Sequence, residues 1–210
     1  MLQKDPLNLL IVGVGGQGNL LASRLIGSCL VEKGFKVTIG ETLGVSQRGG
    51  SVNSFIRISE EKNYSPQFPF GGADIVLGLE PVESLRNMGK YGNPDTVAVV
   101  NKHPVYPIGV LSGELEFPEI EMLESVLREL TGKILFIEAT EKAMELGSPI
   151  FANMILMGGV IGLNKLPVSI DDLYSTLAKI TKGANLSKNL EGFRYGEEEI
   201  HRQLKCCSTD

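Results

Sequence analysis

The sequence predicts an α/β fold: a three-layer, Rossmann-like and mostly parallel sheet flanked by helices, with a helical C-terminal part. Short apolar runs that end at glycine or a polar residue alternate with amphipathic stretches, as buried strands alternate with covering helices. The chain opens with a strand–helix–strand unit, a connection that joins parallel strands in a right-handed sense. After residue 139 the pattern is almost entirely helical. We expect residues 1–210 to form one domain, because the chain is long enough for one core and has no clear linker.

The first half of the chain supplies most of the strands. "LNLLIVG" is a continuous apolar run ended by glycine, and the helix after it has leucines at helical spacing and stops at Gly34. "FKVTIG" is the second strand, and "ETLGVSQRGG" is a loop that leads to a third strand. The prolines and glycines of "YSPQFPFGG" mark another loop. The strands expected here are 7–13, 35–40, 51–60, 73–80 and 95–101, and the helices are 17–33 and 81–89.

The second half is mainly helical. Pro118 suits the first turn of the amphipathic stretch that follows it, and Ser169 is a favourable N-cap. Gly147 and Pro149 separate two further helices, whereas residues 108–117 are irregular. The tail "KCCSTD" is expected to fray. The elements expected here are a strand over 132–140 and helices over 118–130, 139–146, 150–163, 169–180 and 187–200.

Charge and cysteine usage exclude several classes of protein. The chain has 20 Lys and Arg against 25 Asp and Glu, and its basic residues are scattered, so we expect no nucleic-acid partner. "PIFANMILMGGVIGL" is too short and glycine-rich to span a bilayer, so we expect no membrane insertion. Three cysteines, Cys29, Cys206 and Cys207, make no disulfide framework, and no signal segment precedes the first strand, which predicts a cytoplasmic location. Because Cys and His are few and dispersed, any iron–sulfur cluster must sit on a partner.

The first candidate site is the glycine turn Gly13-x-Gly15-x-x-Gly18, between the first strand and the first helix. Such a turn allows close backbone approach to a pyrophosphate and presents the N–H groups of a helix start to an anion. Glu41, 23 residues after Gly18, stands where a ribose-binding acid would lie in an NAD-binding dehydrogenase. A P-loop is excluded, because the required lysine and hydroxyl residue do not follow Gly18. The alternative that these glycines serve only tight helix–strand packing stays open.

The second candidate site is the loop that contains "SQRGG". Arg48, followed by Gly49 and Gly50, is a forked donor suited to a carboxylate, a phosphate or an acidic side chain of a partner, although it could also be a solvated loop charge. Because loops that follow parallel strands emerge at the same edge of a sheet, this loop and the glycine turn should line one crevice. A serine hydrolase is not supported: Ser46 lacks the complete glycine elbow, and His103 is interpreted as a surface loop residue.

The two motifs together resemble a known family. "LLIVGVGGQGNLLASRLIG", "ETLGVSQRGGSVNSFIRI", "YSPQFPFGGADIVLGLEPVESLR", "NMILMGGVIGL" and "KNLEGFRYG" resemble, in order and spacing, the gamma-type subunit of 2-oxoacid:ferredoxin oxidoreductases, and most closely the beta subunit of the indolepyruvate enzymes. The likeness covers nearly the whole chain, and the pairing of the two glycine motifs is its most specific part. The matching residues are Gly13, Gly15, Gly16, Gln17, Gly18, Ser46, Gln47, Arg48, Gly49, Gly50, Glu80 and Asn153.

The resemblance implies a subunit of an enzyme that decarboxylates a 2-oxoacid, transfers the acyl group to coenzyme A and passes electrons to ferredoxin. It also implies that thiamine diphosphate, Mg²⁺ and the iron–sulfur clusters belong to a large partner subunit, and that this chain alone binds no cofactor. The two glycine loops would face the cleft that coenzyme A enters, as cleft or interface residues and not as catalytic groups. A purely structural assembly subunit and an NAD-binding dehydrogenase stay as alternatives.

Overall fold

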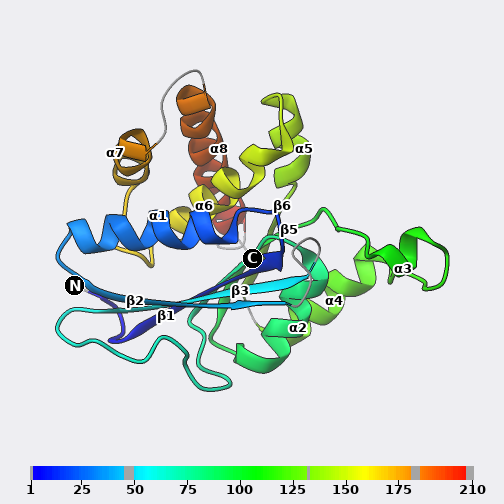
Figure 1. Cartoon of the computed structure of the whole chain (residues 1–210), viewed down its shortest axis with the longest axis horizontal. Coiled ribbons are helices and arrows are strands. Elements are labelled where there is room, and N and C mark those ends of the chain that lie inside the picture. Colours follow the sequence, from blue (N-terminus) through cyan, green and yellow to red (C-terminus); the bar gives the residue numbers. More distant parts are fainter. Residues whose placement is uncertain (1, 45–49, 132, 181–184, 207–210) are drawn as a thin grey trace.

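A mixed sheet crosses the middle of the molecule (Figure 1), and its strands follow the order β2-β3-β1-β4-β5-β6. The computed structural model describes residues 2–44, 50–131, 133–180 and 185–206. The α/β class and the helical C-terminal part are confirmed. The strands are β1 (Leu7–Val14), β2 (Lys36–Leu43), β3 (Ser51–Ser59), β4 (Ile75–Gly78), β5 (Val97–Asn101) and β6 (Lys133–Ile137).

Strand β3 departs from the parallel direction of the rest of the sheet. It runs antiparallel to β1 on one side and to β2 on the other, whereas β1, β4, β5 and β6 pair in parallel. The opening strand–helix–strand unit therefore joins two parallel strands that are not neighbours, because the chain turns back after β2 and inserts β3 between them. The expected loop was also too long at its start: Glu41, Thr42 and Leu43 belong to β2 and pair with β3.

Helices cover both faces of the sheet (Figure 1). On one side, α1 and α6, with α5, α7 and α8 around them, bury the face that carries Leu9 and Ile11. On the other side, α2 and α4 bury the face that carries Leu10 and Val12. The helices are α1 (Asn19–Glu32), α2 (Pro81–Tyr91), α3 (Ile108–Leu111), α4 (Ile120–Leu130), α5 (Ala139–Glu145), the 3-10 helix η1 (Pro149–Phe151), α6 (Ala152–Gly162), α7 (Ile170–Ile180) and α8 (Asn185–Cys206).

Helices α6 and α8 cross at very short range. A Cβ built on Gly196 of α8 would collide with the Ile155 carbonyl of α6, and a Cβ on Gly158 of α6 would collide with the Phe193 carbonyl of α8. Two of the motifs in the family resemblance, "NMILMGGVIGL" and "KNLEGFRYG", are thus the two sides of one helix crossing. The apolar segment is a buried helix, as predicted, and within the described residues no helix is both long and apolar enough to cross a bilayer.

Most element boundaries agree with the sequence prediction, and the differences have local causes. Ser169 lies next to the start of α7 and exchanges hydrogen bonds with Asp172: its N–H and hydroxyl donate to the carboxylate, and its Oγ accepts from the Asp172 N–H. The terminal helix continues through Cys206, so Lys205 and Cys206 are not frayed. Residues 108–117, expected to be irregular, contain the short helix α3, which has no buried residue.

Candidate functional site

The side chain of Gln17 forms hydrogen bonds within the glycine turn and to the end of β4. The Val14 N–H donates to Gln17 Oε1 (2.9 Å), and Gln17 Nε2 donates to the Leu79 carbonyl (3.0 Å) just after β4. A Cβ on Gly13 would lie 2.6 Å from Gln17 Oε1 and 2.9 Å from Leu79 Cβ. Packing within the turn therefore requires glycine at position 13, and the Gln17 amide ties the ends of β1 and β4 together.

Gly18 starts α1 in the left-handed conformation, with φ at 86°, which residues with a Cβ adopt only at a cost. A Cβ there would also collide with Nδ2 of Asn153 on α6. No side chain caps α1, and the Ala22 N–H donates to the Gly18 carbonyl (3.0 Å) as the first bond of the helix ladder. The N–H groups before Ala22 lack ladder partners, so the start of α1 carries the partial positive charge of a helix N-terminus.

The two candidate loops touch. The Gly15 N–H donates to the Gly50 carbonyl (2.9 Å), at the point where Val14 of β1 stands opposite Ser51 of β3. The antiparallel insertion of β3 is what brings them together, because it starts β3 beside the end of β1. Of the "SQRGG" motif, Gly50 is the residue that the structure describes; Ser46, Gln47, Arg48 and Gly49 lie outside the described residues.

A cavity of about 570 Å³ opens beside the glycine turn. It lies where the carboxyl ends of β1, β4 and β5 meet the N-termini of α1 and α6, the usual place for a ligand in an open α/β sheet. Gly16, Gln17 and Gly18 supply one wall. The other walls are formed by Leu21, Leu79, Asn101, His103, Val105, Thr140, Ser148, Pro149, Ile150, Ala152, Asn153 and Leu156.

Asn153 has an unsatisfied polar atom in this wall. The residue is 4% exposed, and among the described residues its Oδ1 has no hydrogen-bond partner. A buried acceptor without a partner costs about 1–3 kcal/mol relative to a satisfied one. A ligand or partner group with an N–H or O–H would recover that cost, so Asn153 is a candidate recognition residue of the cavity.

Glu80 is buried directly behind the cavity wall. It is 1% exposed and is the N-cap of α2: its carboxylate accepts the Glu83 N–H (2.7 Å) and, at 3.5 Å, the Val105 N–H. Burial raises the pKa of the Glu80 carboxyl above its ordinary value, and the backbone hydrogen bonds oppose part of that rise. The contacts make Glu80 a link between α2 and Val105 in the cavity wall.

Several polar wall residues, among them Asn101, His103 and Thr140, were not singled out from the sequence as site residues. Asn101 is the last residue of β5; its side chain donates to Thr140 Oγ1 (2.9 Å) and accepts from the Ala139 N–H (3.2 Å). His103, interpreted as a surface loop residue, lines the cavity while its Nδ1 lies 3.0 Å from Glu141 Oε1. The signal that could have found Asn101 and His103 is their position at or just after the carboxyl end of a parallel strand.

Glu41 is poorly placed for the ribose of a dinucleotide. It is exposed in β2, and β3 separates that strand from β1, whereas the dinucleotide-binding arrangement sets the second strand beside the first. The Glu41 carboxylate accepts a long hydrogen bond from Ser23 of α1 (3.4 Å), and Glu41 is not among the cavity residues. The NAD-binding alternative therefore loses the acid on which it depended.

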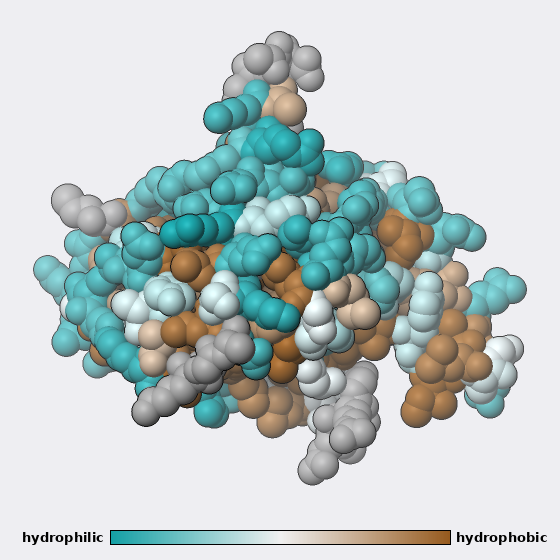
Figure 2. Space-filling view, turned by 90° about the horizontal axis from the view of Figure 1, so that it is seen from above, coloured by the Kyte–Doolittle hydropathy of each residue, from teal (hydrophilic) through white to brown (hydrophobic). Residues whose placement is uncertain are grey.

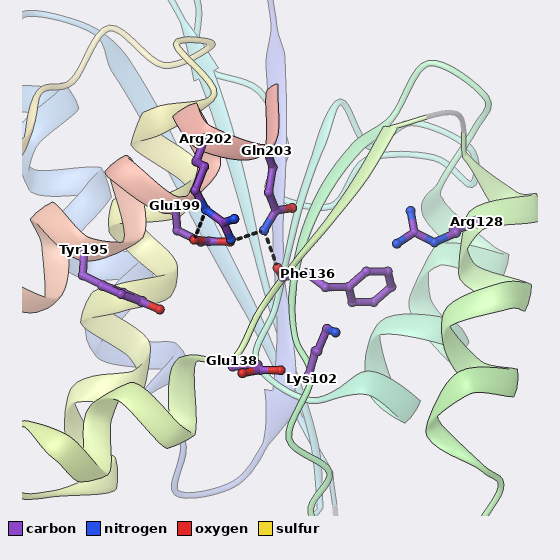
Figure 3. Close-up of a pocket in the computed structure, with 8 residues that line it drawn as sticks. All are labelled: Lys102, Arg128, Phe136, Glu138, Tyr195, Glu199, Arg202 and Gln203. Atoms are coloured by element: carbon purple, nitrogen blue, oxygen red, sulfur yellow. Dashed lines mark hydrogen bonds and ion pairs between the residues drawn. The ribbon is translucent and has the colours of Figure 1, made fainter. Parts of the chain in front are cut away.

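A second hollow, of about 350 Å³, lies over the free edge of β6 (Figure 3). Gln203 of α8 donates to the Phe136 carbonyl of β6 (2.8 Å) and to Glu199 (2.6 Å), and Arg202 also binds Glu199 through two bonds. Burial alone would raise the pKa of Glu199, but these hydrogen bonds hold it below the ordinary value. Arg128 points from α4 across the Phe136 ring. The paired charges indicate a cover for a sheet edge, which protects it against mispairing.

The described residues offer little chemistry outside the cavity. Cys29 is buried, its Sγ lies 3.3 Å from Thr176 Oγ1, and burial raises the pKa of the thiol, so it is a core residue and not a nucleophile. Within the part of the chain that the structure describes, no group of three or more His, Cys, Asp or Glu side chains could hold a metal ion.

Comparison with known proteins reveals close relatives of nearly the same length. The chain is 33% identical to indolepyruvate oxidoreductase subunit IorB of Archaeoglobus fulgidus over 190 residues, 90% of this chain and 93% of the relative. It is 29% identical to pyruvate synthase subunit PorC of Methanothermobacter marburgensis, over 90% of this chain and 94% of the relative.

Solved structures with the same fold include pyruvate oxidoreductase subunit PORC of Thermotoga maritima, with a TM-score of 0.69, 19% identity and coverage of 92% and 96% of the two chains. The 2-oxoglutarate:ferredoxin oxidoreductase of Magnetococcus marinus, solved with 2-oxoglutarate, coenzyme A and succinyl-CoA bound, has a TM-score of 0.73 and 24% identity; the match covers 95% of this chain and 32% of that one. The model of the pyruvate ferredoxin/flavodoxin oxidoreductase family matches residues 8–199. This chain belongs to the pyruvate ferredoxin/flavodoxin oxidoreductase family.

Proposed function

We propose that this chain is a cofactor-free subunit of a 2-oxoacid:ferredoxin oxidoreductase whose substrate is an arylpyruvate, with indolepyruvate the first candidate. The complex would decarboxylate the 2-oxoacid, transfer the acyl group to coenzyme A and pass the electrons to ferredoxin. The observation that carries the proposal is the match to an indolepyruvate oxidoreductase subunit over 90% of this chain and 93% of the relative. Residues 1–210 are taken as one gamma-type domain, and the complex as cytoplasmic.

The cavity beside the glycine turn is the site that we assign to coenzyme A. A phosphate group suits the N–H groups at the start of α1, because they lack ladder partners and carry partial positive charge. Arg48 precedes Gly50 by two residues, and the Gly50 carbonyl accepts a hydrogen bond from Gly15 of the turn. Arg48 would add a forked, charged donor to the site. The unsatisfied Asn153 Oδ1 would accept a hydrogen bond from an amide or hydroxyl of the same ligand. The residues of this turn and loop act by binding and by excluding water, not by covalent chemistry.

The redox chemistry belongs to a large partner subunit in this proposal. Thiamine diphosphate with Mg²⁺ would supply the stabilised carbanion needed for decarboxylation, and iron–sulfur clusters would carry electrons to ferredoxin. This chain would close the site from one side, so that water stays away from the reacting group. The isolated chain is then expected to be colourless and inactive, and to restore activity when it is mixed with the large subunit.

A coenzyme A titration of the assembled complex tests the assignment. Arg48→Ala should raise the KM for coenzyme A about tenfold to a hundredfold, the effect of losing one charged hydrogen bond of about 1.5–3 kcal/mol. Arg24→Ala is the matched control, because Arg24 is exposed on α1 and is not among the cavity residues. An Arg48→Ala complex with the KM of the control would remove Arg48 from the coenzyme A site.

A structural assembly subunit is the second candidate, and one observation favours it. Gly13 and Gly18 are both required by contacts inside the chain, with Gln17 and Leu79 in one case and Asn153 in the other, so a ligand is not needed to explain them. In that case the chain binds the large subunit, and variants of both loops leave the coenzyme A KM unchanged. The titration above separates the two functions.

A further inference from the structure

The segment that leads from β5 into the first turn of α4 is an exposed apolar projection, which we call the arm and define as residues 104–122. It extends from the body at α3 (Figure 1), and Figure 2 shows hydrophobic residues gathered at the same end of the molecule. Ile108 is 85% exposed and Leu111 72%. The other large apolar side chains exposed on the arm are Val105, Tyr106, Leu115 and Met122.

Beyond Val105, the contacts of the arm are mainly internal. The Tyr106 and Phe117 rings stack edge to face at 4.8 Å and close its base. The Leu115 N–H donates to the Gly109 carbonyl (2.9 Å) and folds the tip back on α3. Since α3 buries no residue, its apolar side chains gain little from this fold alone, and an apolar surface of this kind in a folded protein marks an interaction site.

The arm continues into the rim of the cavity. Val105 lines the cavity and its N–H reaches the buried Glu80 carboxylate at 3.5 Å. Ile150 of η1, 68% exposed, and Leu21 of α1, 37% exposed, also line the cavity. A partner that seats on the arm would therefore meet apolar residues up to the mouth of the candidate site and would close it.

Charge distinguishes the possible partners. Residues 103–127 contain five glutamates and no lysine or arginine. Among the described residues, Glu124 pairs with Lys102 (3.5 Å), whereas no ion pair includes Glu114, Glu116, Glu119 or Glu121. A symmetric dimer through the arm would set these carboxylates of two copies against each other, since the same patch forms both sides of such an interface. The arm fits a surface with a basic rim.

We propose that the arm docks into an apolar groove with a lysine- and arginine-rich rim on the large partner subunit, and that this contact closes the cavity. The inference rests on the proposed function, because it needs that subunit. In the Magnetococcus marinus enzyme the same fold is part of a longer chain, of which the match covers 32%. That arrangement supports a neighbour from the same enzyme over a second copy of this chain.

The test measures the affinity of this chain for the purified large subunit by biolayer interferometry. Ile108→Ser combined with Leu111→Ser should weaken binding at least tenfold, and Glu114→Lys combined with Glu116→Lys should weaken it most strongly at low salt, where charge attraction is least screened. Val31→Ser combined with Ile180→Ser is the matched control, because both residues are exposed but lie off the arm. All variants should unfold at the wild-type temperature, since the substituted side chains are exposed.

The outcomes are distinguishable. If the wild-type chain does not bind the large subunit, the proposed function fails and the docking proposal fails with it. If the wild-type chain binds and the arm variants bind equally well, the docking proposal alone is overturned. A wild-type chain that sediments as a dimer, and that the Ile108→Ser and Leu111→Ser changes convert to a monomer, would overturn the docking proposal in favour of self-association.

Discussion

Two glycine-rich regions of this protein differ in the space around their glycines. At the crossing of α6 and α8, the backbone of the opposite helix occupies the space beside the glycines, so a Cβ on Gly196 or Gly158 has no room. At the turn before α1, Gly16 has nothing within 4 Å of the place of its Cβ and faces the cavity. The comparison indicates that the glycines of the crossing serve packing, as Gly13 and Gly18 of the turn also do, whereas Gly16 leaves space that packing does not fill.

The largest expected effect is at the crossing. Gly196→Ala should lower the free energy of unfolding by about 3 kcal/mol, the upper part of the usual range for overpacking, because its Cβ meets a carbonyl of the α6 backbone, which cannot turn aside as a side chain can. Urea unfolding measures it. Loss of less than about 1 kcal/mol would show that the two helices separate easily, and that the crossing is not rigid.

At the turn, Gly18→Ala should lower the free energy of unfolding by about 1–2 kcal/mol for the left-handed backbone, with a further loss from the contact with Asn153. Gly16→Ala is the control, because Gly16 also has a positive φ, of 102°, but open space around it. Gly18→Ala should lose more stability than Gly16→Ala because of the contact with Asn153. Adding Asn153→Ala to Gly18→Ala should restore that extra loss. Additive losses would contradict a contact between positions 18 and 153.

A smaller effect is expected at Glu80, a buried acidic residue behind the cavity that has no counterpart among the described residues of the apolar crossing. Because burial raises the pKa of Glu80 above its ordinary value near 4.5 in the native state, its contribution to stability is complete below that pH and is lost as the pH rises through the raised native pKa. Glu80→Gln should therefore be more stable relative to the wild type at pH 7 than at pH 4. Urea unfolding at both pH values checks this, and an unchanged difference would mean that Glu80 is not desolvated.

The smallest expected effect has the opposite sign. Gly89 lies in α2, exposed and with nothing within 4 Å of its Cβ position, so Gly89→Ala should raise the free energy of unfolding by about 0.5–1 kcal/mol through helix propensity. The result serves as a reference for Gly196→Ala at the crossing, because the substitution is the same and only the neighbouring atoms differ. A loss of stability at position 89 would show that exposed helical glycines in this chain also have a packing role.

The sequence could predict the elements because their signals are local. The apolar run before Gly13, the proline that opens α2 and the serine that precedes α7 each act on neighbouring residues. The antiparallel direction of β3 was not predictable in this way: its alternating pattern suits either direction, and the pairing with β1 and β2 depends on residues far away in the chain. The two glycine motifs were expected to lie together because loops after parallel strands share one edge, but it is the inserted antiparallel strand that brings Gly15 against Gly50.

By itself, the sequence determined the α/β class, the two glycine motifs and the family resemblance, because backbone conformation and apolar periodicity depend on a few adjacent residues. The tertiary structure decided that Asn153 of α6 lies against Gly18 of α1, that Gln17 fills the turn, and that the arm stands away from the core. These are contacts between distant segments, and their geometry follows from how the helices pack on the sheet, which no local pattern encodes.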